Sequence, residues 1–347
     1  MPDALARDTL LRLADRYQMP RVREGFAPIM DALAADLVAL EGDLADIVSG
    51  DERKVASSAR YLLSSGGKRV RPVVCLLASR AFGRAEPASG VKQLAVVAEA
   101  VHSATLLHDD VIDLGDARRD RPAARLVYGN AASVLGGDLL LIQALRIVNE
   151  HGTPALMTSM LDVLRRMIDA ESLQLENRGR ADVPSEDYFR VVDGKTASLF
   201  EWAVEAGGRL GGADDEQVRQ LRRYGSAVGC AFQLLDDLLD LTREPEAIGK
   251  SVLQDVGMGT VTWPVIHALA GRPALAQRIA DASRGAADAT LTGDLLAAVA
   301  ESGAIALTRQ RIEDETAAAL DALSTLPPTQ ARDALSSVAT ALAERAR

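Results

Sequence analysis

Two groups of aspartates follow the same pattern, Asp-Asp-x-x-Asp. Their members are Asp109, Asp110 and Asp113 in the first group and Asp236, Asp237 and Asp240 in the second. On a helix, the first and last aspartates of each group share one face a turn apart, and the middle one lies about 100° round the axis. The residues between them are apolar, so the carboxylates project from helices that otherwise pack against protein. Such placement is costly unless a cation meets the carboxylates.

The residues that follow each group indicate that both groups end a helix. Gly115 comes soon after the first group and Pro245 soon after the second. At a helix C-terminus the macrodipole is negative, and it disfavours an acid by roughly 0.3–1 kcal/mol. A solvated acidic face is an alternative interpretation of one such group, but two copies at two apolar helix ends favour a divalent metal. Clustered carboxylate oxygens suit Mg²⁺, which keeps several waters and bridges protein to phosphates.

Basic residues stand where they could bind an anion. The segment Gly66-Gly67-Lys68-Arg69-Val70-Arg71-Pro72 predicts a glycine-rich turn that opens a helix. It offers backbone N–H groups and three cations to an anion. Further cations lie near turn residues or after the first aspartate group: Arg118, Arg119, Lys195 and Lys250. Each of these, taken singly, is equally explained as a solvated loop residue or a cap on a carbonyl.

Helical periodicity runs through nearly the whole chain. Apolar residues recur every three or four positions in the ranges 26–48, 91–114, 131–149, 153–177, 214–241 and 305–323. No run of alternating β-branched residues predicts a strand. The Gly-Gly pairs at 66–67, 136–137 and 207–208 are expected in turns between helices. We therefore expect one all-α domain over residues 1–347, with a peripheral helix in residues 1–24.

Composition excludes several classes of protein. The 347 residues include 39 Lys and Arg against 49 Asp and Glu, a net charge of −10. This acidity disfavours a nucleic-acid partner. Two cysteines, Cys75 and Cys230, are too few for a disulfide framework. Because the N-terminus is charged throughout and no window reaches the roughly 18 uncharged apolar residues of a membrane span, we expect a cytoplasmic protein without a stable membrane span.

The order of these motifs along the chain is specific. It reads GGKRVRP, HSATLLHDDVID, RR, GKT, FQLLDDLLD and GK, and it includes YGNAASVLGGDLLL at 128–141 and the pair Glu171 and Gln174. From about Ala27 to Arg345 the chain resembles the trans-prenyl diphosphate synthase (polyprenyl synthetase) family, in particular its medium- and long-chain branch. The resemblance implies a single large helical bundle around a central apolar cavity, and a homodimer.

The resemblance also implies a role for each matching residue. Asp109 and Asp113, with Asp110, would hold two Mg²⁺ ions on an allylic diphosphate, and Asp236, with Asp237 and Asp240, a third. The residues expected at the allylic diphosphate are Arg118, Lys195 and Lys250, and those expected at the reacting centre are Thr196 and Gln233. The residues expected to bind isopentenyl diphosphate are Lys68, Arg71, His102 and Arg119.

The expected reaction is repeated prenyl transfer. The allylic diphosphate ionises, the double bond of isopentenyl diphosphate attacks the cation, and a proton is lost, which lengthens the product by five carbons. Ala104 and Thr105 lie roughly 7.5 and 6 Å before Asp109 on the same helix, and both are small. The growing tail therefore meets no bulky plug there, which predicts a product of about thirty carbons or more. Geranylgeranyl diphosphate, with twenty carbons, is the alternative product, and transient membrane contact would release a long one.

The chain departs from the family pattern at two positions. Thr260 stands where the family usually has a lysine, which puts one phosphate contact in doubt, and Asp120 replaces the usual glycine after the arginine pair.

Two other classes of protein are alternatives. A terpene cyclase also uses an aspartate group and Mg²⁺, but cyclases line their cavity with aromatic residues, and aromatics are only 3% here. A regulatory subunit of a heteromeric synthase is the non-enzymatic alternative, although such subunits typically lose an aspartate group.

Overall fold

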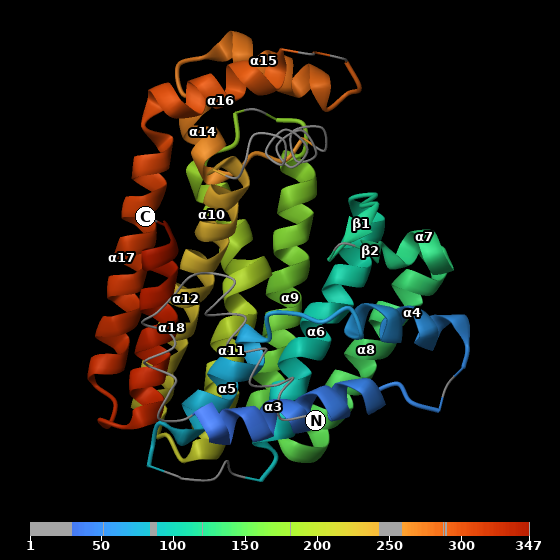
Figure 1. The fold of residues 1–347 in the computed structure, drawn as a ribbon, viewed down its shortest axis with the longest axis vertical. Coiled ribbons are helices and arrows are strands. Elements are labelled where there is room, and N and C mark those ends of the chain that lie inside the picture. The colour runs from blue at the N-terminus through green and yellow to red at the C-terminus, as the bar shows by residue number, and fades with distance from the viewer. Residues whose placement is uncertain are drawn as a thin grey trace. The chain divides into compact units, whose positions relative to one another are not determined.

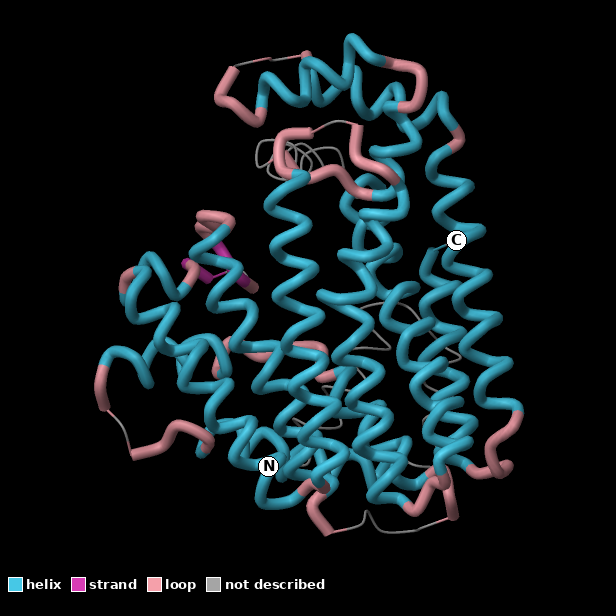
Figure 2. The backbone as a smooth tube through the Cα atoms, turned by 180° about the vertical axis from the view of Figure 1, so that it is seen from behind, coloured by secondary structure: helices cyan, strands magenta, loops and turns pink. Residues whose placement is uncertain are grey.

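The computed structural model describes residues 30–346 apart from 51, 84–88, 120, 181, 243–258, 287 and 289. In the described part the helices are α3 (Met30–Asp46), α4 (Lys54–Leu63), α5 (Val70–Arg80), α6 (Val91–Ile112), α7 (Ala124–Tyr128), α8 (Asn130–His151), α9 (Pro154–Asn177), α10 (Ser185–Val192), η2 (Asp193–Ala197), α11 (Ser198–Gly211), α12 (Asp215–Thr242), α14 (Trp263–Leu269), α15 (Pro273–Ala282), α16 (Leu291–Ser302), α17 (Ala304–Ser324) and α18 (Gln330–Ala346). Figures 1 and 2 show that helix dominates the trace. The prediction of an all-α fold is confirmed.

The chain divides into two compact units. Unit 1 comprises residues 1–161, 199–222 and 323–338, and unit 2 comprises residues 162–198, 223–322 and 339–347. Each unit is described by itself below. The single domain over residues 1–347 stays a prediction, and the peripheral helix predicted in residues 1–24 lies outside the described residues.

Helix bounds follow the apolar periodicity closely. The helix predicted over 91–114 is α6 (Val91–Ile112), and the one predicted over 214–241 is α12 (Asp215–Thr242). The predicted range 305–323 is α17 (Ala304–Ser324). The first aspartate group ends α6, with Asp113 as its C-cap, whereas Asp236 and Asp237 lie more than one turn before Thr242, so the prediction of a last-turn position is wrong for these two residues.

The prediction that Gly136-Gly137 and Gly207-Gly208 form turns is wrong. Both pairs lie inside helices, α8 and α11 respectively. A Cβ on Gly137 would lie 2.3 Å from His108 Nε2, and a Cβ on Gly207 would lie 2.0 Å from the carbonyl oxygen of Cys75. These glycines are required because neighbouring helices approach too closely for a side chain, and not because the backbone turns.

The expectation of no strands needs a small correction. β1 (Ala117–Arg118) and β2 (Arg121–Pro122) pair antiparallel, with Arg118 opposite Arg121. Figure 2 shows the pair in magenta after α6. Two-residue strands carry no alternating pattern that a sequence window could detect. The hairpin fixes the loop that carries Arg118 and Arg119.

The core of unit 1 consists of small and aliphatic side chains. Helix α5 is almost wholly buried from Val73 to Arg80, and α6 is buried from Leu94 to Val101. Ala and Val dominate these stretches, in agreement with the low aromatic content. Such side chains let helices pack at short separation, which explains why α8 needs glycines where it crosses α6.

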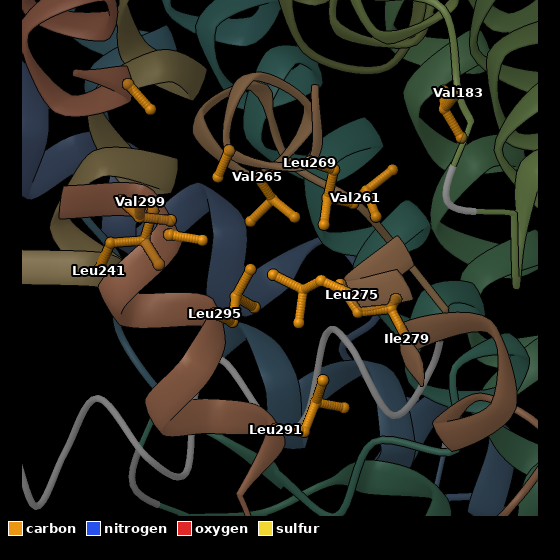
Figure 3. Close-up of a cluster of buried hydrophobic side chains, with 13 residues drawn as sticks. Val183, Leu241, Val261, Val265, Leu269, Leu275, Ile279, Leu291, Leu295 and Val299 are labelled. Carbon is orange, nitrogen blue, oxygen red and sulfur yellow. The ribbon is translucent and has the colours of Figure 1, made fainter. Parts of the chain in front are cut away.

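Unit 2 has an aliphatic cluster of its own. It contains Val183 and Leu241 together with side chains from the segment 261–304, and Figure 3 shows its members. Val265 and Leu269 of α14 meet Leu295 and Val299 of α16 in this cluster. The cluster anchors α14, whose first residue, Trp263, reaches the candidate site of unit 2.

One described helix, α8, is long and apolar enough to cross a membrane by length and composition alone. Helices α16 and α17 pass the same test only as a pair, and they are bent by 60° at their junction. Apolar core helices of proteins that never enter a membrane pass this test too. The result is therefore weak evidence for a span.

Candidate active site

The acids at the end of α6 separate into two outer carboxylates and one buried carboxylate. Asp109 and Asp113 are partly exposed, and the N–H of Asp113 donates to the Asp109 carbonyl across 2.8 Å. Asp110 is 1% exposed and accepts two hydrogen bonds from Arg118, at 3.0 Å from Nε and 2.6 Å from Nη2. Asp110 therefore anchors the loop that follows, while Asp109 and Asp113 are the more accessible members of the group.

These acids suit a hard cation only if other ligands join them. Among the described residues no group of three or more His, Cys, Asp or Glu side chains could hold a metal ion. Two carboxylates one turn apart still fit Mg²⁺, because this ion keeps waters and takes substrate phosphate oxygens as ligands. The same reasoning applies to Asp236 and Asp240 in unit 2, which are also partly exposed.

The loop after α6 is held by Arg125. Its guanidinium donates to the carbonyl of Gly115 across 2.7 Å, and also to the carbonyl of Leu114 and to Asp116. Leu114 and Arg119 adopt left-handed backbone conformations, with φ of 52° and 54°. Non-glycine residues adopt this region rarely, and such strain concentrates at functional sites.

The glycine-rich segment opens a helix, as predicted. Gly66 has φ of 77°, and α5 begins at Val70. Arg71 is 9% exposed, and its guanidinium lies 4.6 Å from the centroid of the Phe200 ring. The start of α5 therefore combines orphan backbone N–H groups with a fixed cation, which together favour an anion.

His102 lies on α6, seven residues before Asp109. Burial lowers its pKa well below the usual 6.5, and the charges of Arg71, Arg119, Arg118 and Arg69 lower it further. His102 is therefore neutral near pH 7. A neutral imidazole donates one hydrogen bond and accepts another without adding charge.

Arg119 lies against the glycine-rich segment. Its Nη1 donates to Ser65 Oγ across 3.3 Å, and its Nη2 would lie 3.1 Å from a Cβ on Gly67. The structure thus brings together three of the residues predicted to bind isopentenyl diphosphate, Arg71, His102 and Arg119, through the charge effects on His102.

In unit 2, Lys195 and Thr196 lie in a short π-helix, η2. Lys195 Nζ donates to Glu171 across 2.6 Å and lies 3.4 Å from Gln174 Oε1. The sequence pair Glu171 and Gln174 is thus a pair in space too, because both side chains meet the same ammonium. Single π-turns inside helices are frequently found at functional sites.

A chain of hydrogen bonds continues from Thr196. Its hydroxyl donates to Gln233 Oε1 across 3.0 Å, and Gln233 Nε2 donates to Asp237 Oδ1 across 2.9 Å. The Tyr188 hydroxyl donates to Asp237 Oδ2 across 2.6 Å. The amide of Gln233 is thereby fixed in one orientation.

Asp237 ends this chain and is 5% exposed. Burial raises the pKa of its carboxyl to about 6, although the hydrogen bonds from Tyr188 and Gln233 oppose the shift. Burial and the Asp237 charge raise the pKa of Tyr188 well above 10, so the phenol keeps its proton and donates. Asp237 thus organises neighbouring side chains, whereas Asp236 and Asp240 are more accessible.

Aromatic rings support Tyr188. Its ring centroid lies 5.2 Å from that of Phe189 and 5.9 Å from that of Trp263. Trp263 in turn lies 4.2 Å from His267, edge to face. Thr260, which stands where a lysine was expected, is described just before α14 and is partly buried.

The remaining predicted residues have mixed outcomes. Lys250 and Asp120 lie outside the described residues. Ala104 is fully buried, and its carbonyl oxygen would lie 2.9 Å from a Cβ on Gly137 of α8. Thr105 is partly exposed, and its hydroxyl donates to the His102 carbonyl across 2.9 Å.

Sequence reasoning missed the residues that hold the site in place. Tyr188 supports Asp237 across 49 positions of the chain, and Glu99 pairs with Arg69 across 30 positions. Arg69 was counted among the cations that the segment offers to an anion, but it is buried and paired with acids. The sequence contains only a weak sign of this pairing, because Glu99 is an acid inside an otherwise apolar stretch of α6.

Known proteins share this fold and much of this sequence. The family model described as "Polyprenyl synthetase" matches residues 52–302. Octaprenyl diphosphate synthase of Escherichia coli (strain K12) is 37% identical over 320 residues, covering 92% of this chain and 98% of the relative. A decaprenyl diphosphate synthase from Rhodobacter capsulatus superposes with a TM-score of 0.85 at 34% identity, over 92% of this chain and 99% of that chain.

A further solved structure carries ligands. Polyprenyl synthase from Caulobacter crescentus CB15, complexed with calcium and isoprenyl diphosphate, has a TM-score of 0.83 at 31% identity, and 97% of each chain is covered. The fold therefore defines an all-α prenyltransferase of the isoprenoid synthase type. The chain belongs to the polyprenyl synthetase family.

Proposed function

We propose that this chain condenses an allylic diphosphate with isopentenyl diphosphate repeatedly and releases an all-trans polyprenyl diphosphate of about thirty carbons or more. The observation that carries the proposal lies in unit 1. Helix α6 bears His102 beside the arginines around the glycine-rich segment, and two turns later it bears the acid pair Asp109 and Asp113. One member of the proposed anion site, His102, and the proposed cation-binding acid pair thus stand on one rigid element. Relatives named for octaprenyl and decaprenyl products support the long chain.

The basic groups divide between the two substrates in this proposal. Lys68, Arg71, His102 and Arg119 bind the diphosphate of isopentenyl diphosphate, with His102 as a neutral donor. Arg118 and Lys195 bind the allylic diphosphate, and Lys250 joins them. The acids paired with Arg118 and Lys195, Asp110 and Glu171, hold these cations in place before substrate arrives.

The acid pairs at the ends of α6 and α12 take divalent metal in this proposal, with two Mg²⁺ ions at Asp109 and Asp113 and a third at Asp236 and Asp240. Bound Mg²⁺ neutralises the charge that develops on the leaving diphosphate. The chain's residues orient the reactants. Thr196 and Gln233 present hydroxyl and carbonyl oxygens, whose dipoles favour a nearby carbocation. The carbon–oxygen bond of the allylic substrate breaks, the new carbon–carbon bond forms, and the departing pyrophosphate accepts the proton.

Product analysis tests this proposal. The purified chain is incubated with Mg²⁺, labelled isopentenyl diphosphate and allylic starters of ten, fifteen and twenty carbons. We expect products longer than the starter by multiples of five carbons, reaching thirty or more. Consumption of the allylic diphosphate without isopentenyl diphosphate would indicate a terpene cyclase. Inactivity of the chain alone would indicate a regulatory subunit, and a product that stops at twenty carbons would indicate a geranylgeranyl diphosphate synthase.

We also propose a homodimer. Its support is the exposed apolar side of α8, where Leu135 is 51% and Ile142 56% exposed. These residues lie seven positions apart, two turns along the helix, so they form one stripe. Light scattering of the purified chain at micromolar concentration measures the mass directly.

The expected cytoplasmic location and the transient membrane contact stay proposals as well. The location is supported by the cysteines, since Cys75 and Cys230 form no disulfide. Membrane contact would follow from the product, because a chain of thirty or more carbons is insoluble in water. Flotation with phospholipid vesicles, with and without bound product, tests the contact.

A further inference from the structure

Arg69 lies in the middle of the glycine-rich segment, yet its side chain is only 1% exposed. It donates four hydrogen bonds: Nε and Nη2 to the two carboxylate oxygens of Glu41 at 2.7 and 3.0 Å, Nη1 to Glu99 at 2.5 Å, and Nη2 to the Leu63 carbonyl at 3.3 Å. The Glu99 side chain is 3% exposed and the Glu41 side chain 45%. We call Glu41, Arg69 and Glu99 the clamp.

The clamp touches the backbone of the turn before α5. A Cβ on Gly67 would lie 3.0 Å from Arg69 Nη1 and 3.2 Å from Glu99 Oε1. The same point lies 3.1 Å from Nη2 of Arg119. Gly67 therefore rests directly on the clamp, and Arg119 lies beside it. The Glu99 charge also favours the charged form of Arg119, whose pKa burial lowers.

The backbone of Arg69 is held in an unusual conformation. It is the N-cap residue of α5 with φ of 49° and ψ of 28°, and its side chain makes no capping hydrogen bond. A bulky residue in the left-handed region is strained and persists when its surroundings enforce it. The three hydrogen bonds within the clamp supply that enforcement, because they fix the guanidinium relative to α3 and α6.

We propose that Arg69 is a positioning residue that binds no substrate but fixes, through Glu41 and Glu99, the turn that presents Lys68 and the start of α5 to the diphosphate of isopentenyl diphosphate. This inference rests on the proposed function of that turn. Arg69 differs from the other basic residues of the segment in its capacity to bind a ligand. An arginine whose N–H groups donate to two carboxylates has few donors left for a substrate. Its positive charge is offset within the clamp by two carboxylates.

The test measures isopentenyl diphosphate binding in Arg69→Lys and Glu41→Gln. Lysine keeps the charge but cannot reach two carboxylates with a planar fork. For Arg69→Lys we expect the dissociation constant of isopentenyl diphosphate, measured by calorimetry without an allylic substrate, to rise by about tenfold, as for one weakened charge-assisted contact. The Michaelis constant for isopentenyl diphosphate should rise in parallel, whereas the Michaelis constant for the allylic diphosphate and the turnover at saturation should change less than about twofold.

Glu41→Gln keeps the proposal testable if Arg69→Lys does not fold. Its carboxylate is nearly half exposed, so the change leaves no new buried charge at position 41. We expect a smaller rise, about threefold, in the same dissociation constant, since Glu99 still holds Arg69.

A second buried ion pair, which joins α5 to α3, provides the matched control. Arg80 of α5 pairs with Asp36 of α3, and both side chains are 4% exposed. Arg80→Lys and Asp36→Asn should lower the melting temperature without changing isopentenyl diphosphate affinity. If Arg69→Lys lowers the melting temperature as these controls do and leaves the affinity unchanged, the clamp is only structural and the inference is overturned.

The two proposals fail in different ways. A wild-type chain that binds isopentenyl diphosphate but makes no product contradicts the proposed function and leaves the clamp supported by the calorimetry. A wild-type chain that makes product, with unchanged affinity in both clamp variants, contradicts the clamp alone.

Discussion

At the scale of single residues, the acids of each Asp-Asp-x-x-Asp group have different tasks. Asp110 and Asp237, the middle members, are buried and hold Arg118, Gln233 and Tyr188. The outer members are partly exposed. A helix places the middle residue about 100° from the residue before it, so one short motif supplies both an inward anchor and more accessible carboxylates.

Removal of an outer aspartate should stop the reaction without unfolding the chain. For Asp109→Ala and Asp236→Ala we expect turnover to fall by about 100-fold or more, equivalent to about 2.7 kcal/mol of transition-state stabilisation. Helix content by circular dichroism should stay unchanged, because a ligand is lost and not packing. Asp162→Ala, an exposed acid of α9, is the control and should keep wild-type turnover. Near-native rates at saturating Mg²⁺ in either variant would contradict the metal assignment.

Tyr188→Phe isolates the hydroxyl that donates to Asp237. The ring stays packed against Phe189 and Trp263, but one oxygen of a buried carboxylate loses its donor. We expect turnover to fall by about tenfold and stability by about 1–3 kcal/mol. Tyr224→Phe, another buried tyrosine, is the control and should affect stability only. Equal turnover in the two variants would show that Asp237 needs no support from Tyr188.

His102 makes the folded state sensitive to acid. Its pKa in the folded chain lies well below the ordinary value near 6.5, so the unfolded chain binds the proton more readily. The contribution of the neutral imidazole is fully present above pH 6.5 and is lost as the pH falls towards the folded pKa. Urea unfolding at pH 7.5 and 5.5 should show a smaller loss of stability in His102→Gln than in wild type. An identical loss in both would assign the pH dependence to other groups.

At the scale of elements, glycines set how closely helices pack. Gly137 of α8 meets His108 and the Ala104 carbonyl of α6, and Gly136 meets Ser58 of α4. The same helix therefore contacts two neighbours through positions that carry no side chain. A sequence cannot distinguish this use of glycine from a turn, since both need the absence of Cβ.

Gly137→Ala should therefore destabilise the chain. The added methyl would lie 2.9 Å from the carbonyl oxygen of Ala104, which is backbone and cannot rotate away. We expect a loss of about 1–3 kcal/mol in the free energy of unfolding. Gly42→Ala in α3, where nothing lies within 4 Å, should gain up to about 1 kcal/mol from helix propensity. Chemical denaturation measures the change in the free energy of unfolding for both variants. An unchanged free energy in Gly137→Ala would contradict the close crossing of α8 and α6.

The sequence predicts local features well and distant pairings poorly. The bounds of α6, α12 and α17 follow from the spacing of apolar residues, and the turn before α5 follows from Gly66 and Gly67. The clamp does not, because Glu41, Arg69 and Glu99 come from separate segments that only packing brings together. The same holds for Tyr188 and Asp237. Charged residues predict that a partner exists, but their spacing along the chain does not say which one.

At the scale of the whole molecule, the open question is product length. The two small residues before Asp109 differ in their surroundings: Ala104 is fully buried and Thr105 is partly exposed. A bulky side chain at either position should block a growing tail that runs along α6. Only a bulky side chain at position 104 should also disturb the packing of α6 against α8, because the Ala104 carbonyl lies where Gly137 of α8 crosses α6.

Thr105→Phe and Ala104→Phe should both shorten the product below that of wild type. Chromatography of labelled products should show a loss of at least two five-carbon units in each variant. Ala104→Phe should in addition lower stability by about 1–3 kcal/mol through overpacking, whereas Thr105→Phe should change it little. Unchanged product length in both variants would mean that the tail follows another face.

The π-helix that carries Lys195 and Thr196 has a consequence for how this chain tolerates insertions and deletions. Its closing N–H, from Ser198, reaches back five residues to the carbonyl of Asp193, so the turn contains one residue more than the α-helical turn it replaces. Removing any one of the five residues would restore a regular α-helical turn and leave the later residues close to their present angular positions, because the wide turn absorbs the extra residue. A single-codon deletion here should therefore keep the helix and displace Lys195 or Thr196 from Glu171 and Gln233.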